Sequence, residues 1–292
     1  MIYIPSRPLL HVFKRQFHNS IPLCQKPLTR SLWKTVSVSP IDGTSQVALQ
    51  LDGRTVRTPG GLPLEFPDTH TVLASMLQRE WQAVTEKATK GKGPGNWKKL
   101  QRENLPLTSL VGRCLGLQMS PKDRNAAKKS LIPFIDTDTL VVMSPQNELD
   151  GVLRSRQEEL YPKFVKLTED LFSKDFNPEG SAPLRLSILD TETHGIRPHK
   201  QSQPVTDAAV NYLDSLTPWN LAVMEHTVVA TKSFLCGILL LQSWAPVKDI
   251  AELSLLEAIC QAERWGSIPE SHERERLQLE QSLHCAALVA FG

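Results

Sequence analysis

The chain has 292 residues, of which 40% are hydrophobic, and this is enough for one large domain or two smaller ones. Its formal net charge of +2 gives no reason to expect nucleic acid or an anionic membrane as the main partner. No two of the five cysteines stand at C-x-x-C spacing, so neither a zinc knuckle nor a disulfide framework is predicted. The longest strongly apolar run, 234–241, is too short for stable membrane insertion, since a spanning helix takes about 20 residues.

The N-terminal segment has the composition of an organellar transit peptide. Residues 1–41 contain neither Asp nor Glu but are rich in Ser, Lys and Arg. Cations are favoured in an import sequence because the membrane potential that draws it inward is negative inside. The run from Arg15 to Ser20 resembles the mitochondrial processing pattern R-x-F-x-x-S. We therefore interpret 1–31 as a disordered mitochondrial transit peptide and expect a mitochondrial location, in the matrix or associated with the inner membrane. A disordered basic tail of a cytosolic or nuclear protein is the alternative.

Residues 32–145 are predicted to form a β-rich domain with some helices. Alternating patterns predict strands at 33–38, 47–51, 54–58 and 62–66. Asp52-Gly53, between the second and third of these, is a strong hairpin signal because a type I′ turn needs positive φ. Helices are expected at 69–86, from 105 onward and at 125–134, and the Gly- and Lys-rich segment 88–99 is expected to be an exposed loop.

Residues 146–292 are predicted to form a mostly helical C-terminal domain. Apolar periodicity indicates helices at 147–173, 204–215, 218–242, 246–264 and 271–290. The polar, Pro-rich segment 174–203 is expected to be an irregular connection. The predicted fold class is therefore α+β, with a β-rich domain followed by a helical one.

No pattern of residues indicates a catalytic or cofactor site. The segment 91–96 lacks the spacing of a phosphate-binding loop, and no second histidine follows His226 at metal-ligand spacing. We interpret Asp136 and Asp138 as turn caps around the apolar run 140–143 rather than as metal ligands. We predict no metal and no cofactor.

Glu257 is the acid that the pattern singles out. Its helical neighbours in the predicted helix 246–264 are partly apolar, so that helix is either buried or presents a surface to a partner. A plain solvent-exposed acid is the equally weighted alternative.

Several motifs then occur in an order and at a spacing typical of one family. They are Leu51-Asp52-Gly53-Arg54 with Arg57-Thr58-Pro59, Glu80-Trp81, Leu105-Pro106-Leu107-Thr108, Phe134-Ile135-Asp136-Thr137-Asp138-Thr139, Trp219-Asn220, and Leu256-Glu257 with Gln261 and Trp265-Gly266. Over residues 32–280 the chain resembles the mitochondrial F1-ATPase assembly chaperones that bind the α subunit, the ATP synthase assembly factor 2 family. It departs from that pattern in a longer 88–100 loop, in Leu160-Tyr161-Pro162, and in Ala258 where the family has a second acid.

The resemblance implies a non-enzymatic chaperone. It would bind the unassembled F1 α subunit in the matrix as a monomer and keep it from aggregating before it pairs with β. By resemblance, the client-binding residues are Glu257 and Gln261, and the structural residues are Trp81, Asp52, Gly53 and Trp265. Two other readings are a matrix enzyme of unrecognised type, which would need a deep polar cleft near Asp136, Asp138 or His226, and a structural subunit of a mitochondrial complex.

Overall fold

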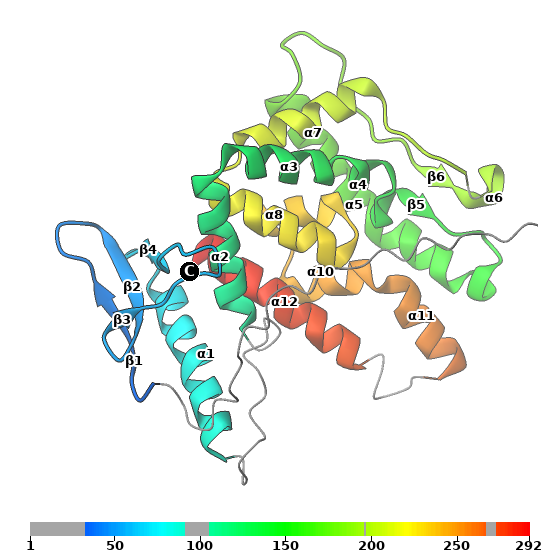
Figure 1. Ribbon diagram of the computed structural model, residues 1–292. Coiled ribbons are helices and arrows are strands. Elements are labelled where there is room, and N and C mark those ends of the chain that lie inside the picture. Colours follow the sequence, from blue (N-terminus) through cyan, green and yellow to red (C-terminus); the bar gives the residue numbers. More distant parts are fainter. Residues whose placement is uncertain (1–32, 91–104, 196, 267–272) are drawn as a thin grey trace, which may run out of the picture.

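The computed structural model describes residues 33–90, 105–195, 197–266 and 273–292. A small antiparallel sheet and helix α1 (Thr71–Lys90) lie on one side of the molecule, a larger body of helices lies on the other, and α2 (Pro106–Met119) stands between them (Figure 1). The predicted α+β class, with the sheet first and the helices second, is confirmed. The predicted transit peptide, most of the predicted loop 88–99 and the start of the last predicted helix lie outside the described residues.

The sheet is built around one central strand. Its strands are β1 (Val36–Pro40), β2 (Gln46–Leu51), β3 (Arg54–Thr55) and β4 (Glu65–Pro67). The central strand β2 pairs with β1 along one edge, while β3 and β4 share its other edge, and all these pairs are antiparallel. Leu51 faces Arg54, so Asp52 and Gly53 alone form the turn, with φ values of 49° and 75°. Both φ values are positive, as a type I′ turn requires, and the predicted hairpin is confirmed.

The helical body contains most of the chain. After α2 come α3 (Pro121–Leu131), α4 (Pro133–Asp136), α5 (Val152–Asp175), α6 (Thr191–His194), α7 (Gln203–Ser215), α8 (Pro218–Thr231), α9 (Phe234–Leu241), α10 (Val247–Ser254), α11 (Leu256–Trp265) and α12 (Arg274–Phe291). Two 3₁₀ turns, η2 (Thr139–Val141) and η3 (Glu148–Gly151), precede α5, and β5 (Val142–Met143) pairs in parallel with β6 (Leu189–Asp190). Apart from β6 and α6, the described part of 176–202 is irregular, so the predicted connection 174–203 is shorter by two residues at its start and by one at its end.

Two predicted helices are each divided in two, and a third is longer than predicted. The helix expected at 218–242 stops at Lys232, which has a left-handed φ of 58°, and restarts after Ser233. The Ser233 hydroxyl accepts a hydrogen bond from the Cys236 amide and so caps α9. The helix expected at 246–264 is broken at Leu255, between α10 and α11. Helix α1 continues to Lys90, so residues 88–90 are helical and not part of a loop.

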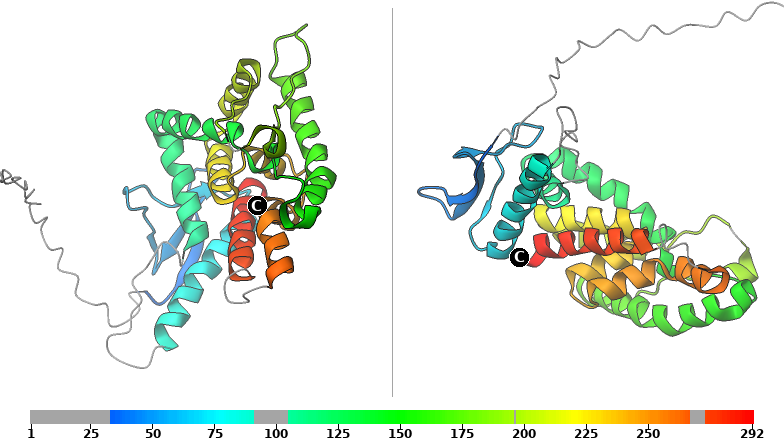
Figure 2. Two further views of the ribbon diagram at one scale, coloured as in Figure 1. Left: turned by 90° about the vertical axis from the view of Figure 1, so that its right-hand side faces the viewer. Right: turned by 90° about the horizontal axis from the view of Figure 1, so that it is seen from below.

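A single buried core runs through the sheet side and the helical body. Helix α2 packs on α8 and α12, and α12 ends beside the start of α1 (Figure 2). The fully buried side chains include Leu49 of the sheet and Phe234 of α9. The division into two domains at residue 145 stays a prediction. Helices α2 and α3, on the N-terminal side of this boundary, pack against α8 on its C-terminal side. No described helix combines the length and the apolar character needed to cross a membrane.

Candidate functional site

Helix α11 presents an open face that carries the predicted client-binding residues. Glu257, Gln261 and Trp265 are spaced four residues apart, so they form one line along the helix. The Gln261 Nε2 donates a hydrogen bond of 2.9 Å to the Glu257 Oε1. Ala258 and Ala262, both partly exposed, lie beside that line. We call these five residues the α11 stripe.

Trp265, predicted to be structural by family resemblance, lies at the surface. It is 72% exposed, the largest value among the exposed large hydrophobic residues that the structure describes. It stands at the last position of α11, immediately before Gly266, whose φ of 90° ends the helix. A large exposed aromatic side chain next to a polar pair is typical of a protein-binding surface and contributes little to a core.

The predicted structural residue Trp81 lies where two of the sequence motifs meet. Its ring is 7% exposed and stands edge-on to that of Trp33, with 5.3 Å between the ring centres. The Trp81 Nε1 donates to the Thr108 Oγ1 at 2.9 Å. The carboxylate of Glu80 accepts from the backbone amides of Leu107 and Thr108 at 2.8 and 2.9 Å, and thereby caps the start of α2. The motifs Glu80-Trp81 and 105–108 thus join α1 to α2.

Burial and hydrogen bonding act in opposite directions on Glu80. Burial raises the pKa of the Glu80 carboxyl above its usual range, and the hydrogen bonds from Thr108 and Leu107 partly offset this. The arrangement is that of a buried helix cap.

Asp52 fixes the start of the sheet by accepting hydrogen bonds from the backbone. Its Oδ1 accepts from the Thr35 amide at 2.8 Å and from the Lys34 amide at 2.9 Å, so the turn holds the chain that leads into β1. These backbone hydrogen bonds, the one from Thr35 first, lower the pKa of the Asp52 carboxyl. Together with Gly53, which supplies the positive φ, Asp52 belongs to the scaffold of the sheet.

Asp138 is fully buried and joins distant parts of the helical body. Its carboxylate accepts from the Leu140 amide at 2.9 Å, the Ser233 hydroxyl at 2.7 Å and the Leu235 amide at 2.9 Å. It therefore caps both η2 and the buried start of α9. Burial raises its pKa to about 6. Asp138 thus caps the turn at the apolar run 140–143 as predicted, whereas the neighbouring Asp136 accepts from the Gln201 amide at 2.9 Å, 65 residues away in the sequence.

His226 makes a contact between helices. Its Nε2 lies 2.7 Å from the Ser282 Oγ of α12, and burial lowers its pKa. Both oxygens of the adjacent Glu225 bind Arg113 of α2, at 2.6 and 2.8 Å. This carboxylate is therefore engaged elsewhere and does not orient the imidazole as the third member of a catalytic triad would.

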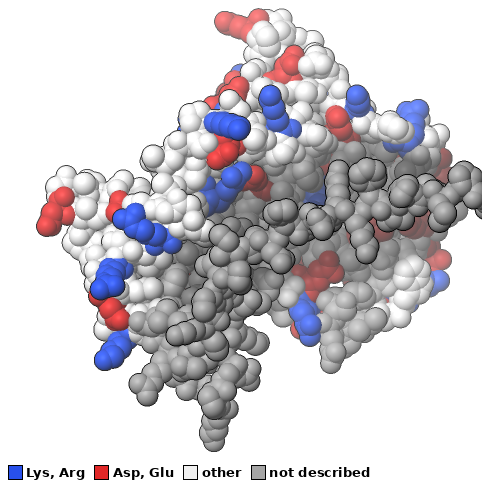
Figure 3. All heavy atoms as spheres, in the orientation of Figure 1, with Lys and Arg blue, Asp and Glu red and all other residues white. Residues whose placement is uncertain are grey.

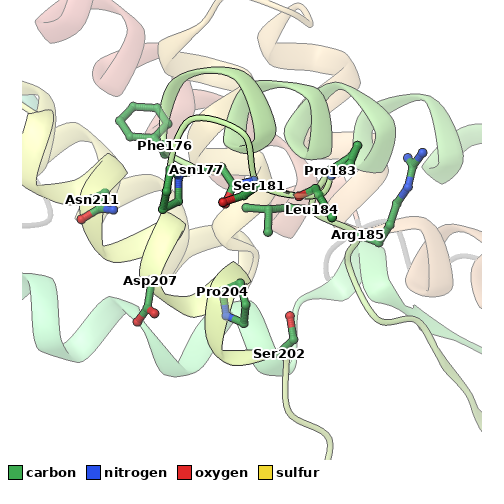
Figure 4. Close-up of a pocket in the computed structure, with 12 residues that line it drawn as sticks. Phe176, Asn177, Ser181, Pro183, Leu184, Arg185, Ser202, Pro204, Asp207 and Asn211 are labelled. Carbon is green, nitrogen blue, oxygen red and sulfur yellow. Dashed lines mark hydrogen bonds between the residues drawn. The ribbon is translucent and has the colours of Figure 1, made fainter.

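Neither of two surface hollows is lined by Asp136, Asp138 or His226. One of about 700 Å³ is formed by residues 176–185 and the start of α7, and Figure 4 shows Asn177, Asp207 and Asn211 on its walls. Asp207 is the one carboxylate among the described residues that line it, and they include no His or Cys. A second hollow of about 430 Å³ lies between β4 and the facing ends of α2 and α8, next to Met119 and Trp219.

Basic and acidic side chains of the described residues are interspersed on the face shown in Figure 3. Within the described residues no group of three or more His, Cys, Asp or Glu side chains is placed to hold a metal ion.

Comparison with known proteins gives consistent results. The ATP12 chaperone protein family matches residues 30–169. The protein named "Protein ATP12, mitochondrial" of Saccharomyces cerevisiae is 36% identical over 287 residues, which cover 90% of this chain and 84% of that protein. "Protein atp12, mitochondrial" of Schizosaccharomyces pombe is 31% identical over 272 residues, covering 93% and 85%. The crystal structure of Atp12 from Paracoccus denitrificans has the same fold, with a TM-score of 0.64 at 23% identity over 90% of this chain and 97% of that one. Both yeast relatives are mitochondrial by name, so the predicted mitochondrial location is confirmed.

Proposed function

Because this chain belongs to the ATP12 chaperone family, we propose that it is an assembly chaperone for the F1 sector of mitochondrial ATP synthase. It binds the unassembled α subunit in the matrix and keeps this subunit from aggregating until it pairs with β. It acts as a monomer, without cofactor, metal, nucleic acid or a catalytic step of its own.

The physical need for such a protein comes from the client. A subunit of an obligate hetero-oligomer exposes an apolar interface before its partner arrives, and surfaces of this kind aggregate. A chaperone must cover the interface specifically and then release it. An acid among apolar neighbours suits this task, because a charge selects the partner without giving maximal affinity.

The exposed Trp265 beside the Glu257–Gln261 pair is the observation that carries the proposal. Trp265 offers a large apolar anchor, and Ala258 and Ala262 leave room for side chains of the client to approach the helix. Glu257 is exposed and can pair with a basic group of the client at the edge of this contact. Among the described surfaces, the α11 stripe is the one that unites an exposed aromatic ring with residues identified by family resemblance.

The test is a substitution of reversed charge on the stripe. We expect Glu257→Lys to fold normally but to bind purified α subunit at least about tenfold more weakly, since a like charge opposes the basic group of the client. Light scattering of dilute α subunit, with and without the chaperone, measures protection from aggregation. Glu179→Lys makes the same change of charge at an exposed site in the loop after α5 and serves as the matched control.

If the wild type and the Glu257→Lys variant protect the α subunit equally, Glu257 does not belong to the client-binding surface. Failure of the wild-type protein to bind α subunit would refute the proposed function itself. Co-purification with mature ATP synthase at fixed stoichiometry would instead favour a structural subunit, and turnover of a small metabolite would favour an enzyme.

A further inference from the structure

The side of α11 that packs against the rest of the protein is held by one arginine of α5. The Arg156 Nη2 lies 2.7 Å from the Glu263 Oε2, and the Nη1 donates to the Cys260 Sγ at 3.6 Å. Cys260 and Glu263 are three residues apart, so they lie on the same face of α11. A single planar guanidinium therefore contacts α11 at two points one turn apart.

A second ion pair anchors the end of the same helix. The Arg264 Nη2 lies 2.7 Å from the Asp150 Oδ2. Asp150 belongs to a turn in which three successive residues, 149–151, have positive φ values of 50°, 57° and 81°. Backbone of this kind persists where the surrounding structure holds it, and here it presents the carboxylate of Asp150 to Arg264.

These contacts have a consistent register. Along η3 and α5 the residue number rises from Asp150 through Arg156 to Tyr161, while the residue numbers of their partners fall along α11 and α10. Tyr161 completes the series, because its hydroxyl donates to the Leu253 carbonyl oxygen at 3.3 Å. The two segments thus lie antiparallel, side by side, and α11 packs on both α5 and η3.

The rotation of α11 about its own axis decides which residues face the solvent. At about 100° per residue, Leu256, Cys260 and Glu263 lie roughly opposite the centre of the α11 stripe. Leu256 and Cys260 are the buried residues of this helix, so its apolar anchorage is small. A helix with so little buried surface can turn or fray unless polar contacts hold it.

We propose that Arg156 is a positioning residue for client binding: by holding Cys260 and Glu263 it fixes the rotation of α11 that turns Glu257, Gln261 and Trp265 outward. This inference rests on the proposed function. The Arg156 side chain does not belong to the α11 stripe and acts through α11. The pair of Asp150 and Arg264 supports the same orientation from the end of the helix.

The experiment uses the full-length protein with Arg156→Gln. We expect α-subunit binding to weaken by about tenfold, because a site held loosely loses much of its preorganised affinity. We expect the midpoint of thermal unfolding to stay unchanged, since Arg156 and Glu263 are 35% and 51% exposed and pairs at such sites contribute little to stability. Hydrogen exchange at the backbone amides of 256–265 should become faster, whereas exchange in the buried helix α9 should not change.

Rescue separates positioning from a general structural role. The charge exchange Arg156→Glu with Glu263→Arg should recover most of the binding and of the exchange protection. Lys166→Gln removes an exposed ion pair with Asp170 on the same helix α5 and is the matched control, with no expected effect on either measurement.

The two proposals fail in different ways. If Arg156→Gln binds α subunit like the wild type while Glu257→Lys does not, the positioning role is wrong and the proposed function stands. If the wild type binds no α subunit, the proposed function is wrong, and the exchange measurement still tests the effect of Arg156 on α11. Unchanged exchange at 256–265 in Arg156→Gln would overturn the inference by itself.

Discussion

Replacing Trp81 by arginine tests whether the junction of α1 and α2 holds the fold together. The Trp81 ring is 7% exposed, stands against Trp33 and donates a hydrogen bond to Thr108. Arginine at this position removes the ring and places a guanidinium where there is little water. The same exchange at Trp265, which is 72% exposed, changes neither the core nor a buried hydrogen bond.

The expected cost follows from the burial of the ring. Truncating a buried tryptophan costs roughly 3–5 kcal/mol, and an uncompensated charge adds to this. Since domains are stable by only about 5–15 kcal/mol, Trp81→Arg should be largely unfolded at physiological temperature. Trp81→Phe keeps most of the apolar contact but loses the donor to Thr108, so it should cost only about 1–2 kcal/mol. Trp265→Arg should stay within about 0.5 kcal/mol of the wild type.

Urea unfolding followed by far-ultraviolet circular dichroism measures these differences as shifts of the transition midpoint. The expected order of stability is wild type and Trp265→Arg together, then Trp81→Phe, then Trp81→Arg. Equal midpoints for Trp81→Arg and Trp265→Arg would refute the reasoning, because they would show that burial of the first ring contributes nothing that the exposed second ring lacks.

Two further predictions concern the hairpin and the buried acid. Gly53 has a φ of 75° and no atom within 4 Å of an added Cβ, so Gly53→Ala should lower the free energy of unfolding by about 1–2 kcal/mol through backbone strain alone. Gly116→Ala, inside α2 and equally unhindered, should instead raise the free energy of unfolding by about 0.5–1 kcal/mol. Urea unfolding in which both variants were stabilised, or both destabilised, would contradict this. The pKa of Asp138 is raised from 3.8 to about 6, because the fold favours the protonated carboxyl. The contribution of Asp138 to the free energy of unfolding, roughly 3 kcal/mol, is therefore fully present at low pH and is lost as the pH rises through 6. The stability of Asp138→Asn relative to the wild type should therefore rise between about pH 4 and pH 7, and parallel pH profiles in denaturant titrations would rule out a titrating Asp138.

Local chemistry made some elements predictable from the sequence. Asp52-Gly53 between two alternating runs requires a two-residue turn, and the structure has that turn with the expected signs of φ. The role of Asp138 as a cap beside the apolar run 140–143 was likewise predicted, and its carboxylate accepts from the Leu140 amide two residues away. In both cases a deciding partner is within a few residues in the sequence, whereas Asp136 accepts from the Gln201 amide, 65 residues away.

Long-range contacts decided the elements that were predicted wrongly. Residues 218–242 are so apolar that periodicity gave one helix, but the chain restarts at Ser233, whose hydroxyl binds Asp138 from 95 residues away. Arg156 and Glu263 are 107 residues apart, so no local pattern indicated their pairing. Trp265 was expected to be structural by family resemblance alone, although its spacing of four residues from Gln261 and eight from Glu257 indicated a common helix face.

The distribution of burial separates stability from binding in this molecule. In α9 all residues from Phe234 to Leu240 are buried, whereas in α11 only Leu256 and Cys260 are. Most of the free energy of folding therefore comes from helices other than α11, since apolar burial is its main favourable term. Changes on the α11 stripe should then alter the proposed client binding while the protein stays folded, whereas changes at Trp81 should destabilise the fold itself. Under the proposed function, a surface on a shallowly anchored helix can also detach when β replaces it, because little core packing is disturbed in that step.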